Sequence, residues 1–262
     1  MSKKAILLIN LGTPDSYSTA DVRKYLREFL MDKYVIDLPY ITRWFLVNVI
    51  IATFRAPKSA KVYKELWTKE GSPLLVYGNK VRELLQKEVG NEVSVYLAMR
   101  YQNPSIKSVL TQLKKDVITE IVAIPLYPQY ASSSTKSSIE KVKEVLKKMN
   151  YQPKVTFIEN FLSNEKFIET FAENGNKHWQ TGNYQKVLFS YHGIPERHIL
   201  NDSEKGYCQL NDKCCAKYNK NNRLCYRAQC YETTRLIAAK MGLKEHEYET
   251  VFQSRLETRA RD

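Results

Sequence analysis

The 262-residue chain has little of what loose, fibrous or membrane-spanning proteins need. It holds only 9 glycines and 9 prolines and no low-complexity tract, which argues against collagen-like and disordered classes. No apolar run reaches the roughly 20 residues that a helix needs to cross a bilayer. The first ten residues offer too short an apolar run for a secretory signal, so we expect a cytoplasmic protein.

Acidic residues are also scarce: 28 Asp and Glu stand against 41 Lys and Arg, for a formal net charge of +13. Such an excess attracts anionic partners, which include nucleic acids, lipid surfaces and acidic small molecules. The chain has no nucleic-acid-binding motif, and lysine pairs such as Lys114-Lys115 are typical of solvated helix faces. Gly12-Thr13-Pro14 also lacks the glycine spacing of a phosphate-binding loop. We therefore expect no nucleic-acid partner.

The chain does contain a regular alternation of strand-like apolar runs and amphipathic helical segments. Strands are expected at residues 5–9, 93–99, 121–126, 155–158, 187–191 and 250–253. Because helices separate them, the pattern predicts an α/β fold in which parallel sheets carry helices on both faces. The polar, proline-containing stretch 150–154 is the candidate link between two similar halves, residues 1–150 and 151–262.

Residues 187–198 form the most informative segment. The apolar residues 187–189 predict a buried strand, which a glycine and a proline then end. Chemistry in open α/β sheets sits at the carboxyl ends of strands, and His192 stands there. Since the chain has only 4 histidines, His192 is the candidate catalytic base or metal ligand. His198, which lies beyond Pro195, is expected at the surface.

Two further segments suit an anionic, flat ligand. Residues 128–135 carry several hydroxyls beside tyrosines and lead into a helix, whose amino terminus favours an anion. Helix capping is the alternative for these hydroxyls. Arg100-Tyr101 follows a strand, and a guanidinium beside an aromatic ring suits a carboxylate on a flat ring system. A surface salt bridge is the alternative for Arg100.

The stretch 43–55 is apolar and lies between two arginines. It is either a core helix or an exposed lip that grips an apolar ligand or rests on a membrane. The sequence alone favours the core, and peripheral membrane contact is the alternative.

All 5 cysteines fall within one segment, residues 203–231. They are Cys208, Cys214, Cys215, Cys225 and Cys230, with the spacing C-x5-C-C-x9-C-x4-C. A cytosolic location argues against disulfides. Thiolates gathered in one loop favour zinc or an iron–sulfur cluster, although the spacing fits no common zinc finger. A four-thiolate site leaves one cysteine over, and reactive or packed cysteines are the alternative.

A set of segments, taken together, resembles the ferrochelatase family, whose members insert ferrous iron into a porphyrin at the end of haem synthesis. In chain order the segments are Leu7-Leu8-Ile9-Asn10-Leu11-Gly12-Thr13-Pro14, Val22-Arg23-Lys24-Tyr25-Leu26, Gly71-Ser72-Pro73-Leu74, Met99-Arg100-Tyr101, Pro128-Gln129-Tyr130, Ser190-Tyr191-His192-Gly193-Ile194-Pro195 and Phe252-Gln253-Ser254-Arg255. The chain most resembles the type found in the Bacteroidetes. The resemblance implies a lyase of the metal-chelatase kind, with two Rossmann-like halves around a porphyrin cleft and protoporphyrin IX or coproporphyrin as substrate.

The resemblance also implies roles for individual residues. His192 would take a pyrrole proton or bind the incoming Fe²⁺, which is a substrate. Contacts to the porphyrin are implied for a set of cationic, aromatic and hydroxyl side chains: Arg23, Ser72, Arg100, Tyr101, Tyr130, Ser132, Ser133, Ser134 and Thr135. Some bacterial members hold a [2Fe–2S] cluster in such an internal segment, so four of the 5 cysteines are its candidate ligands.

One departure from the family concerns the end of the chain. After Phe252-Gln253-Ser254-Arg255-Leu256 it runs through a short charged stretch to Asp262, where the family continues with a stretch that carries a catalytic glutamate. Glu257 does not sit in that glutamate motif. We therefore expect an incomplete second half and reduced or absent turnover. The alternative function is a non-catalytic fragment that binds a tetrapyrrole or a metal.

Overall fold

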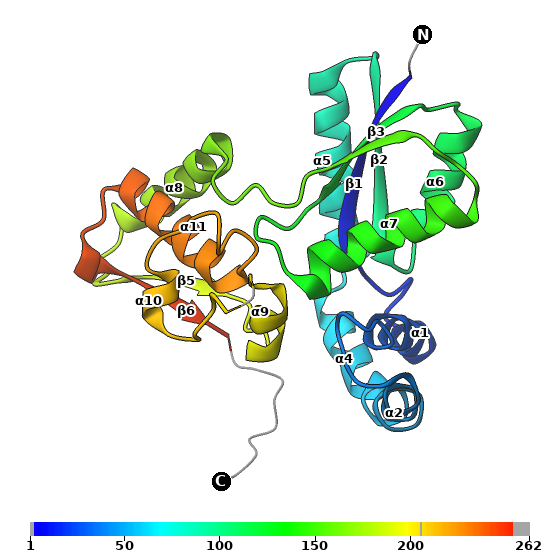
Figure 1. Ribbon diagram of the computed structural model, residues 1–262, viewed down its shortest axis with the longest axis horizontal. Coiled ribbons are helices and arrows are strands. Elements are labelled where there is room, and N and C mark those ends of the chain that lie inside the picture. Colours follow the sequence, from blue (N-terminus) through cyan, green and yellow to red (C-terminus); the bar gives the residue numbers. More distant parts are fainter. Residues whose placement is uncertain (1–2, 205, 254–262) are drawn as a thin grey trace. The chain divides into compact units, whose positions relative to one another are not determined.

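Contacts divide the chain into two units in the computed structural model, which describes residues 3–204 and 206–253 (Figure 1). The first unit holds the chain up to Tyr127 together with Ser132–Glu159. The second unit holds Pro128–Ala131 and the chain from Asn160 onward. The last residues that resemble the family, Ser254 and Arg255, lie outside the described residues, as does Glu257.

The first unit is built on a parallel sheet, as the alternation of strands and helices predicts. In the described part of the chain its strand order is β2-β1-β3-β4. The strands are β1 (Lys4–Gly12), β2 (Val93–Tyr101), β3 (Glu120–Pro125) and β4 (Lys154–Phe157). Leu7 of β1 is in register with Tyr96 of β2 and Ala123 of β3, so these side chains point to one face. The predicted α/β class is confirmed.

Helices cover both faces of this sheet (Figure 1). They are α5 (Pro73–Val89), α6 (Ile106–Lys115) and α7 (Ser137–Lys148). One face packs on α6 and α7 through a core that includes Leu7, Leu110 and Val142. The other face packs on α5 through Leu8 and Leu97. Burial of each such leucine contributes ~1.5–3 kcal/mol relative to exposure, so alternate residues of β1 hold helices on opposite sides.

Helices also gather where β1 ends (Figure 1). These are α1 (Thr19–Leu30) and α4 (Ala56–Leu66), which pack against each other. Ser18 caps α1, because its Oγ accepts a hydrogen bond from the Asp21 amide at 3.1 Å, as the capping pattern predicts. Val22 and Tyr25 of α1 share one core with Ala56 of α4. This core positions the chain that follows the first strand.

The expectation that the stretch 43–55 is a core helix is wrong. The chain forms α2 (Tyr40–Phe45), a π-helical turn η1 (Leu46–Ile51) and the short α3 (Ala52–Phe54). Val47 and Ala52 are buried, but Phe45 is 54% exposed and Phe54 is 72% exposed. Since the stretch is apolar on all sides, only one side can fill the core. The exposed apolar side chains of this stretch and of the start of α2 form an apolar lip: Tyr40, Ile41, Trp44, Phe45, Val49, Ile50 and Phe54. Among the residues that the structure describes, no helix is long and apolar enough to cross a bilayer.

The second unit carries a smaller parallel sheet, which consists of β5 and β6 in its described part. Its elements are α8 (Glu165–Trp179), β5 (Val187–Tyr191), α9 (Glu196–Asp202), α10 (Asp212–Cys215), α11 (Tyr226–Met241), the 3₁₀-helix η3 (Glu245–Glu247) and β6 (Tyr248–Phe252). Ile168 and Ala172 of α8 pack on Ile237 of α11, and Phe189 of β5 lies against this core. Leu188, on the opposite side of β5, is 60% exposed. The described helices therefore bury one face of this sheet through Phe189.

The division between the units differs from the expected link at residues 150–154. These residues lead into β4, and Val155 of β4 pairs with Ile121 of β3. The first unit therefore continues to Glu159, because the hydrogen bonds of a sheet edge attach β4 to it. Pro128–Ala131 pack in the second unit although they lie between segments of the first. The hydrophobic periodicity of the sequence does not predict this.

Gly12 at the end of β1 is required by a close approach of two strands. Its φ is +110°, and a Cβ placed there would lie 2.0 Å from the carbonyl oxygen of Tyr101. We predict that Gly12→Ala lowers the free energy of unfolding by ~3–5 kcal/mol, measured by urea denaturation. Gly71 is the matched control, since its φ is +116° but its Cβ would meet nothing within 4 Å. Gly71→Ala should cost only the backbone strain of ~1–3 kcal/mol; equal losses would contradict the account.

Candidate active site

The strand order places a crevice in the first unit. In the strand order β2-β1-β3-β4, β1 lies between β2 and β3, so the chain leaves β1 towards one side of the sheet and later returns to the other. Open α/β sheets bind ligands beyond the carboxyl ends of the strands at such a point. Thr13 follows β1, and Tyr127 follows β3. Thr13 and Tyr127 therefore lie at the edge of the sheet where ligands bind.

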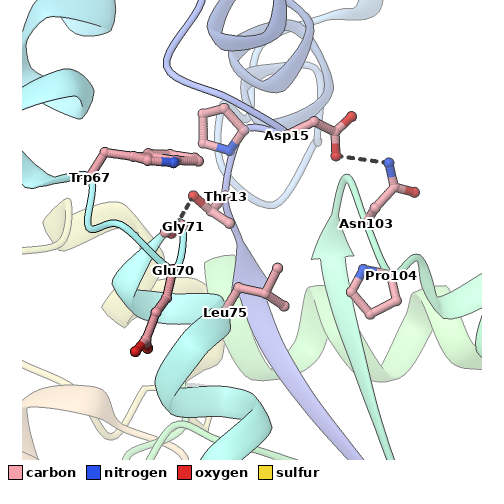
Figure 2. A pocket seen from close by; sticks show the side chains of 10 residues that line it. Thr13, Asp15, Trp67, Glu70, Gly71, Leu75, Asn103 and Pro104 are labelled. Carbon is pink, nitrogen blue, oxygen red and sulfur yellow. Dashed lines mark hydrogen bonds between the residues drawn. The ribbon is translucent and has the colours of Figure 1, made fainter.

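A cavity of about 500 Å³ opens at this edge, beside the end of β1 (Figure 2). Its lining comprises Thr13, Pro14, Asp15, Trp67, Glu70, Gly71, Ser72, Leu75, Asn103 and Pro104. The hydroxyl of Thr13 donates a hydrogen bond to Ser72 Oγ at 2.8 Å, and both residues are buried. Asn103 Nδ2 donates to Asp15 Oδ1 at 2.9 Å along another side of the opening (Figure 2). Ser72, a predicted porphyrin contact, therefore lines the same cavity as the loop after β1.

Arg100 and Tyr101 take part in a buried polar network. Arg100 Nη2 donates to Asp32 Oδ2 at 2.5 Å, and Tyr101 donates its hydroxyl proton to the same oxygen at 2.8 Å. Ser137 Oγ donates to it as well and accepts from Arg100 Nε at 2.7 Å. Burial raises the pKa of Tyr101, so its hydroxyl stays a donor. The ion pair of Arg100 is therefore internal, and contact of this residue with a porphyrin stays a prediction.

Asp32 is a residue that sequence reasoning missed. It follows α1 as an isolated acidic residue, and no spacing rule links it to Arg100 across 68 positions. Its side chain is only 4% exposed. The only signal was indirect: a buried arginine requires an anionic partner, and the sequence does not say which.

Arg23 lies on α1 and is half-buried. Its Nε donates a hydrogen bond to the carbonyl oxygen of Ala52 at 3.1 Å, which ties α1 to α3 beside the apolar lip. The structure therefore gives Arg23 a position next to exposed apolar residues, while its contact with a porphyrin stays a prediction.

The hydroxyl-rich segment 128–135 contains a short helical turn before α7. Residues Ser132–Lys136 form a π-helical turn, η2, which runs into α7. Ser132 and Thr135 are buried, and Ser133 and Ser134 are half-buried. Because π-helical turns are rare and often occur at functional sites, this turn supports the segment as part of a binding site.

Tyr130, in the same segment, belongs to the second unit and is buried. Its backbone amide donates to Gln229 Oε1 of α11 at 2.8 Å. The structure thus separates Tyr130 from Ser132–Thr135, although only one residue lies between them in the sequence.

His192 is exposed and directly follows β5, the position that the sequence predicts. The backbone amide of His192 hydrogen-bonds to the hydroxyl oxygen of Tyr226, which lies at the start of α11. Next to it, a cavity of about 390 Å³ is lined by Gly193, Ile194, Glu196, Ile199, Leu210, Tyr226, Arg227, Tyr231, Phe252 and Gln253. An exposed imidazole at a strand end beside an aromatic cavity can exchange protons with a bound ring or coordinate a metal ion.

The expectation that His198 lies at the surface is wrong. It is only 5% exposed. Helix α9 begins directly after Pro195 and turns His198 and Ile199 inward, where Ile199 packs with the cysteines. The break at Pro195 starts a new helix, of which His198 and Ile199 are buried and Leu200 is exposed.

The cysteines separate into a group of four and a single residue. Cys215 and Cys225 are buried in one cluster with Cys208 and Cys214 packed against them, and the sulfurs of Cys214 and Cys215 lie 3.8 Å apart. Cys230 lies elsewhere on α11, where burial raises its pKa and its thiol contacts the Tyr226 hydroxyl. Among the residues that the structure describes, no three His, Cys, Asp or Glu side chains already surround one point that a metal ion could occupy.

Hydrogen bonding within the group of four distinguishes its thiols. A hydrogen bond from Cys215, aided by backbone amides of α11, lowers the pKa of Cys225 to about 6 although burial opposes this. The same pairing with Cys225 and burial raise the pKa of Cys215. Within this pair the hydrogen bond therefore favours the thiolate on Cys225, and thiolates are the form that binds metals.

Comparison with known proteins gives one consistent result. A family model described as Ferrochelatase matches residues 3–260. The ferrochelatase of Coxiella burnetii (strain RSA 493 / Nine Mile phase I) is 41% identical over 259 residues, which cover 97% of this chain and 71% of that protein. The ferrochelatase of Opitutus terrae is 44% identical, over 98% of this chain and 74% of its own length. That of Legionella pneumophila (strain Paris) is 43% identical, over 97% of this chain and 75% of its own length. This chain therefore belongs to the ferrochelatase family.

Proposed function

We propose that the protein inserts ferrous iron into a porphyrin, as a metal chelatase of haem synthesis. One observation carries the proposal: in a chain that belongs to the ferrochelatase family, His192 is an exposed imidazole at the carboxyl end of β5. Protoporphyrin IX and coproporphyrin are the candidate substrates, and Fe²⁺ is the second substrate.

The chemistry faces two barriers, and the residues address both. A flat macrocycle shields its nitrogens, and two pyrrole protons must leave before the metal is bound. Binding energy from the periphery of the ring can hold it in a bent form that resembles the transition state. His192 then accepts a pyrrole proton on a ring nitrogen, and general-base help of this kind is worth about 10²–10⁴-fold.

Side chains at the sheet edge of the first unit and in the segment that follows β3 would contact the edge of the porphyrin. The candidate contacts are Arg23, Ser72, Arg100, Tyr101, Tyr130, Ser132, Ser133, Ser134 and Thr135. Arg100 uses Nε and Nη2 for Ser137 and Asp32, and its guanidinium carries further N–H donors at Nη1. One propionate of the porphyrin would suit that remaining edge.

An absorbance titration under anaerobic conditions tests the proposal. Protoporphyrin IX and coproporphyrin are titrated separately, and Fe²⁺ is then added to each complex. The proposal expects a saturable shift of the Soret band and conversion of the free-base spectrum to that of the iron porphyrin, dependent on the protein. A chain that binds neither porphyrin would overturn the function. Binding without insertion would support the non-catalytic alternative.

A [2Fe–2S] cluster is proposed for the group of Cys208, Cys214, Cys215 and Cys225. The donor set fits the group, because four soft thiol ligands share one packed cluster and a hydrogen bond already favours the thiolate of Cys225. The positions need to close around the metal, since they do not yet surround one point. Bound there, the redox-active cluster would connect the four cysteines and so hold together the cysteine-bearing segment, residues 203–231.

We propose that the protein is cytoplasmic and touches membranes through the apolar lip. The lip exposes a run of large apolar side chains: Tyr40, Ile41, Trp44, Phe45, Val49, Ile50 and Phe54. Arg55 and Lys58 are exposed directly beyond it. Apolar side chains next to cations suit an anionic lipid surface.

Sedimentation with vesicles that contain anionic lipid measures this contact. Replacing Ile41 and Phe54 together by Asp should weaken vesicle binding by at least about tenfold, because each buried side chain of this size contributes ~1.5–3 kcal/mol. Leu84→Asp is the control, since Leu84 is 65% exposed on α5 and outside the lip. Equal binding of the double variant and the wild type would exclude the lip as the contact.

A further inference from the structure

A fully buried glutamine joins two segments that the proposed function treats separately. Gln229 lies on α11 and is 0% exposed. A buried amide must satisfy both its oxygen and its nitrogen, or its burial costs free energy. Gln229 does so with two backbone groups from distant parts of the chain.

At one end, Gln229 Oε1 accepts a hydrogen bond from the Tyr130 amide at 2.8 Å. Tyr130 lies in Pro128–Ala131, the short segment that packs in the second unit while the residues before and after it belong to the first. Gln129 Nε2 donates to Thr233 Oγ1 at 3.0 Å, one turn of α11 further on. Two successive residues of the segment are therefore attached to one helix.

At the other end, Gln229 Nε2 donates to the carbonyl oxygen of Arg223 at 2.8 Å. Arg223 precedes Cys225, and the loop around it is ordered by the buried Asn222. Asn222 Nδ2 donates to the carbonyl oxygens of Cys214 and Lys217 at 3.1 and 2.8 Å. The hydrogen bond to the cysteine-bearing segment therefore fixes the orientation of the Gln229 amide, so that its oxygen faces the Tyr130 amide.

We propose that Gln229 is a positioning residue for porphyrin binding: it holds Tyr130, within the segment Pro128–Ala131, in the conformation that receives the ring. This inference rests on the proposed function, which places that segment against the porphyrin. Gln229 itself does not touch substrate. A ligand contact on a segment with no strand or helix of its own needs such an anchor, because an unanchored segment must be ordered when the ligand binds.

The test compares variants by porphyrin affinity, thermal stability and hydrogen exchange at the Tyr130 amide. Gln229→Leu removes both hydrogen bonds and keeps the apolar volume of the side chain. We expect its dissociation constant for protoporphyrin IX to rise roughly tenfold, equivalent to ~1.4 kcal/mol. The Tyr130 amide should exchange at least about ten times faster. Gln229→Glu keeps an oxygen that accepts from the Tyr130 amide. Burial favours its neutral acid, whose O–H can donate to the Arg223 carbonyl oxygen, so this variant should restore most of the affinity even where Gln229→Leu folds poorly.

Gln86 provides a matched control in the first unit. Its side chain also bridges backbone groups, since Nε2 donates to the Gly90 and Val93 carbonyl oxygens and Oε1 accepts from the Val95 amide. Gln86→Leu should lower stability without changing porphyrin affinity. Unchanged affinity in a folded Gln229→Leu, or an equal loss in Gln86→Leu, would overturn the inference. A wild-type chain that binds no porphyrin would overturn the proposed function, and the exchange rates would still decide whether Gln229 holds Tyr130.

Discussion

Replacing His192 by alanine is expected to reduce the rate of iron insertion by about 10²–10⁴-fold, the usual worth of a general base. The side chain is exposed, so the change removes no core packing and the fold should persist. Porphyrin affinity should stay within about threefold of the wild type, because the proposed ring contacts lie on other residues. A fall in turnover without a fall in binding would place the role of His192 in the chemical step.

His246 is the control for this experiment. It is an exposed histidine of the same unit, in η3 between Glu245 and Glu247, and no proposed step uses it. His246→Ala should insert iron at the wild-type rate. If both variants lost activity together, a general effect of removing a surface imidazole would explain the loss and His192 would lose its role.

Replacing Cys225 by serine is expected to remove bound iron–sulfur chromophore completely. The wild type, purified without oxygen, should show visible absorbance and about two iron atoms per chain. Cys225 is central because it is buried in one cluster with Cys215, against which Cys208 and Cys214 pack. A serine hydroxyl is a much poorer ligand for the iron of such a cluster than a cysteine thiolate, so the cluster should not assemble.

Cys230→Ser separates this site from a general effect of cysteine loss. Cys230 is buried apart from the group of four and contacts Tyr226. The variant should keep its colour and iron content. A colourless, iron-free but folded wild type would refute the cluster, and a colourless Cys230→Ser with a coloured Cys225→Ser would reverse the assignment of the ligands.

Much of the architecture could be predicted from local sequence, because its causes are local. The alternation of apolar residues fixes which face of β1 each side chain covers, and Ser18 caps α1 through an amide three residues away. The position of His192 follows from the same logic, since Gly193 and Pro195 end the apolar strand and leave the preceding His192 at the sheet edge.

Other features depend on partners far away in the chain, and no local pattern encodes them. Arg100 was expected to meet a ligand carboxylate or the surface, but it meets Asp32 in a buried network. The apolar stretch 43–55 has the composition of a core helix, and its composition does not indicate that Phe54 is exposed while Val47 and Ala52 are buried. The hydrogen bond between the Tyr130 amide and Gln229 likewise joins residues 99 positions apart.

Chemical rescue is the most direct test of the claim that the imidazole of His192 performs the proton step. Protoporphyrin IX is bound to His192→Ala beforehand, and insertion of Fe²⁺ is followed in a single turnover with increasing concentrations of free imidazole. The rate should rise with the imidazole concentration in His192→Ala and stay constant in His246→Ala. A rate in His192→Ala that equals the wild type, or that imidazole leaves unchanged, would contradict this claim.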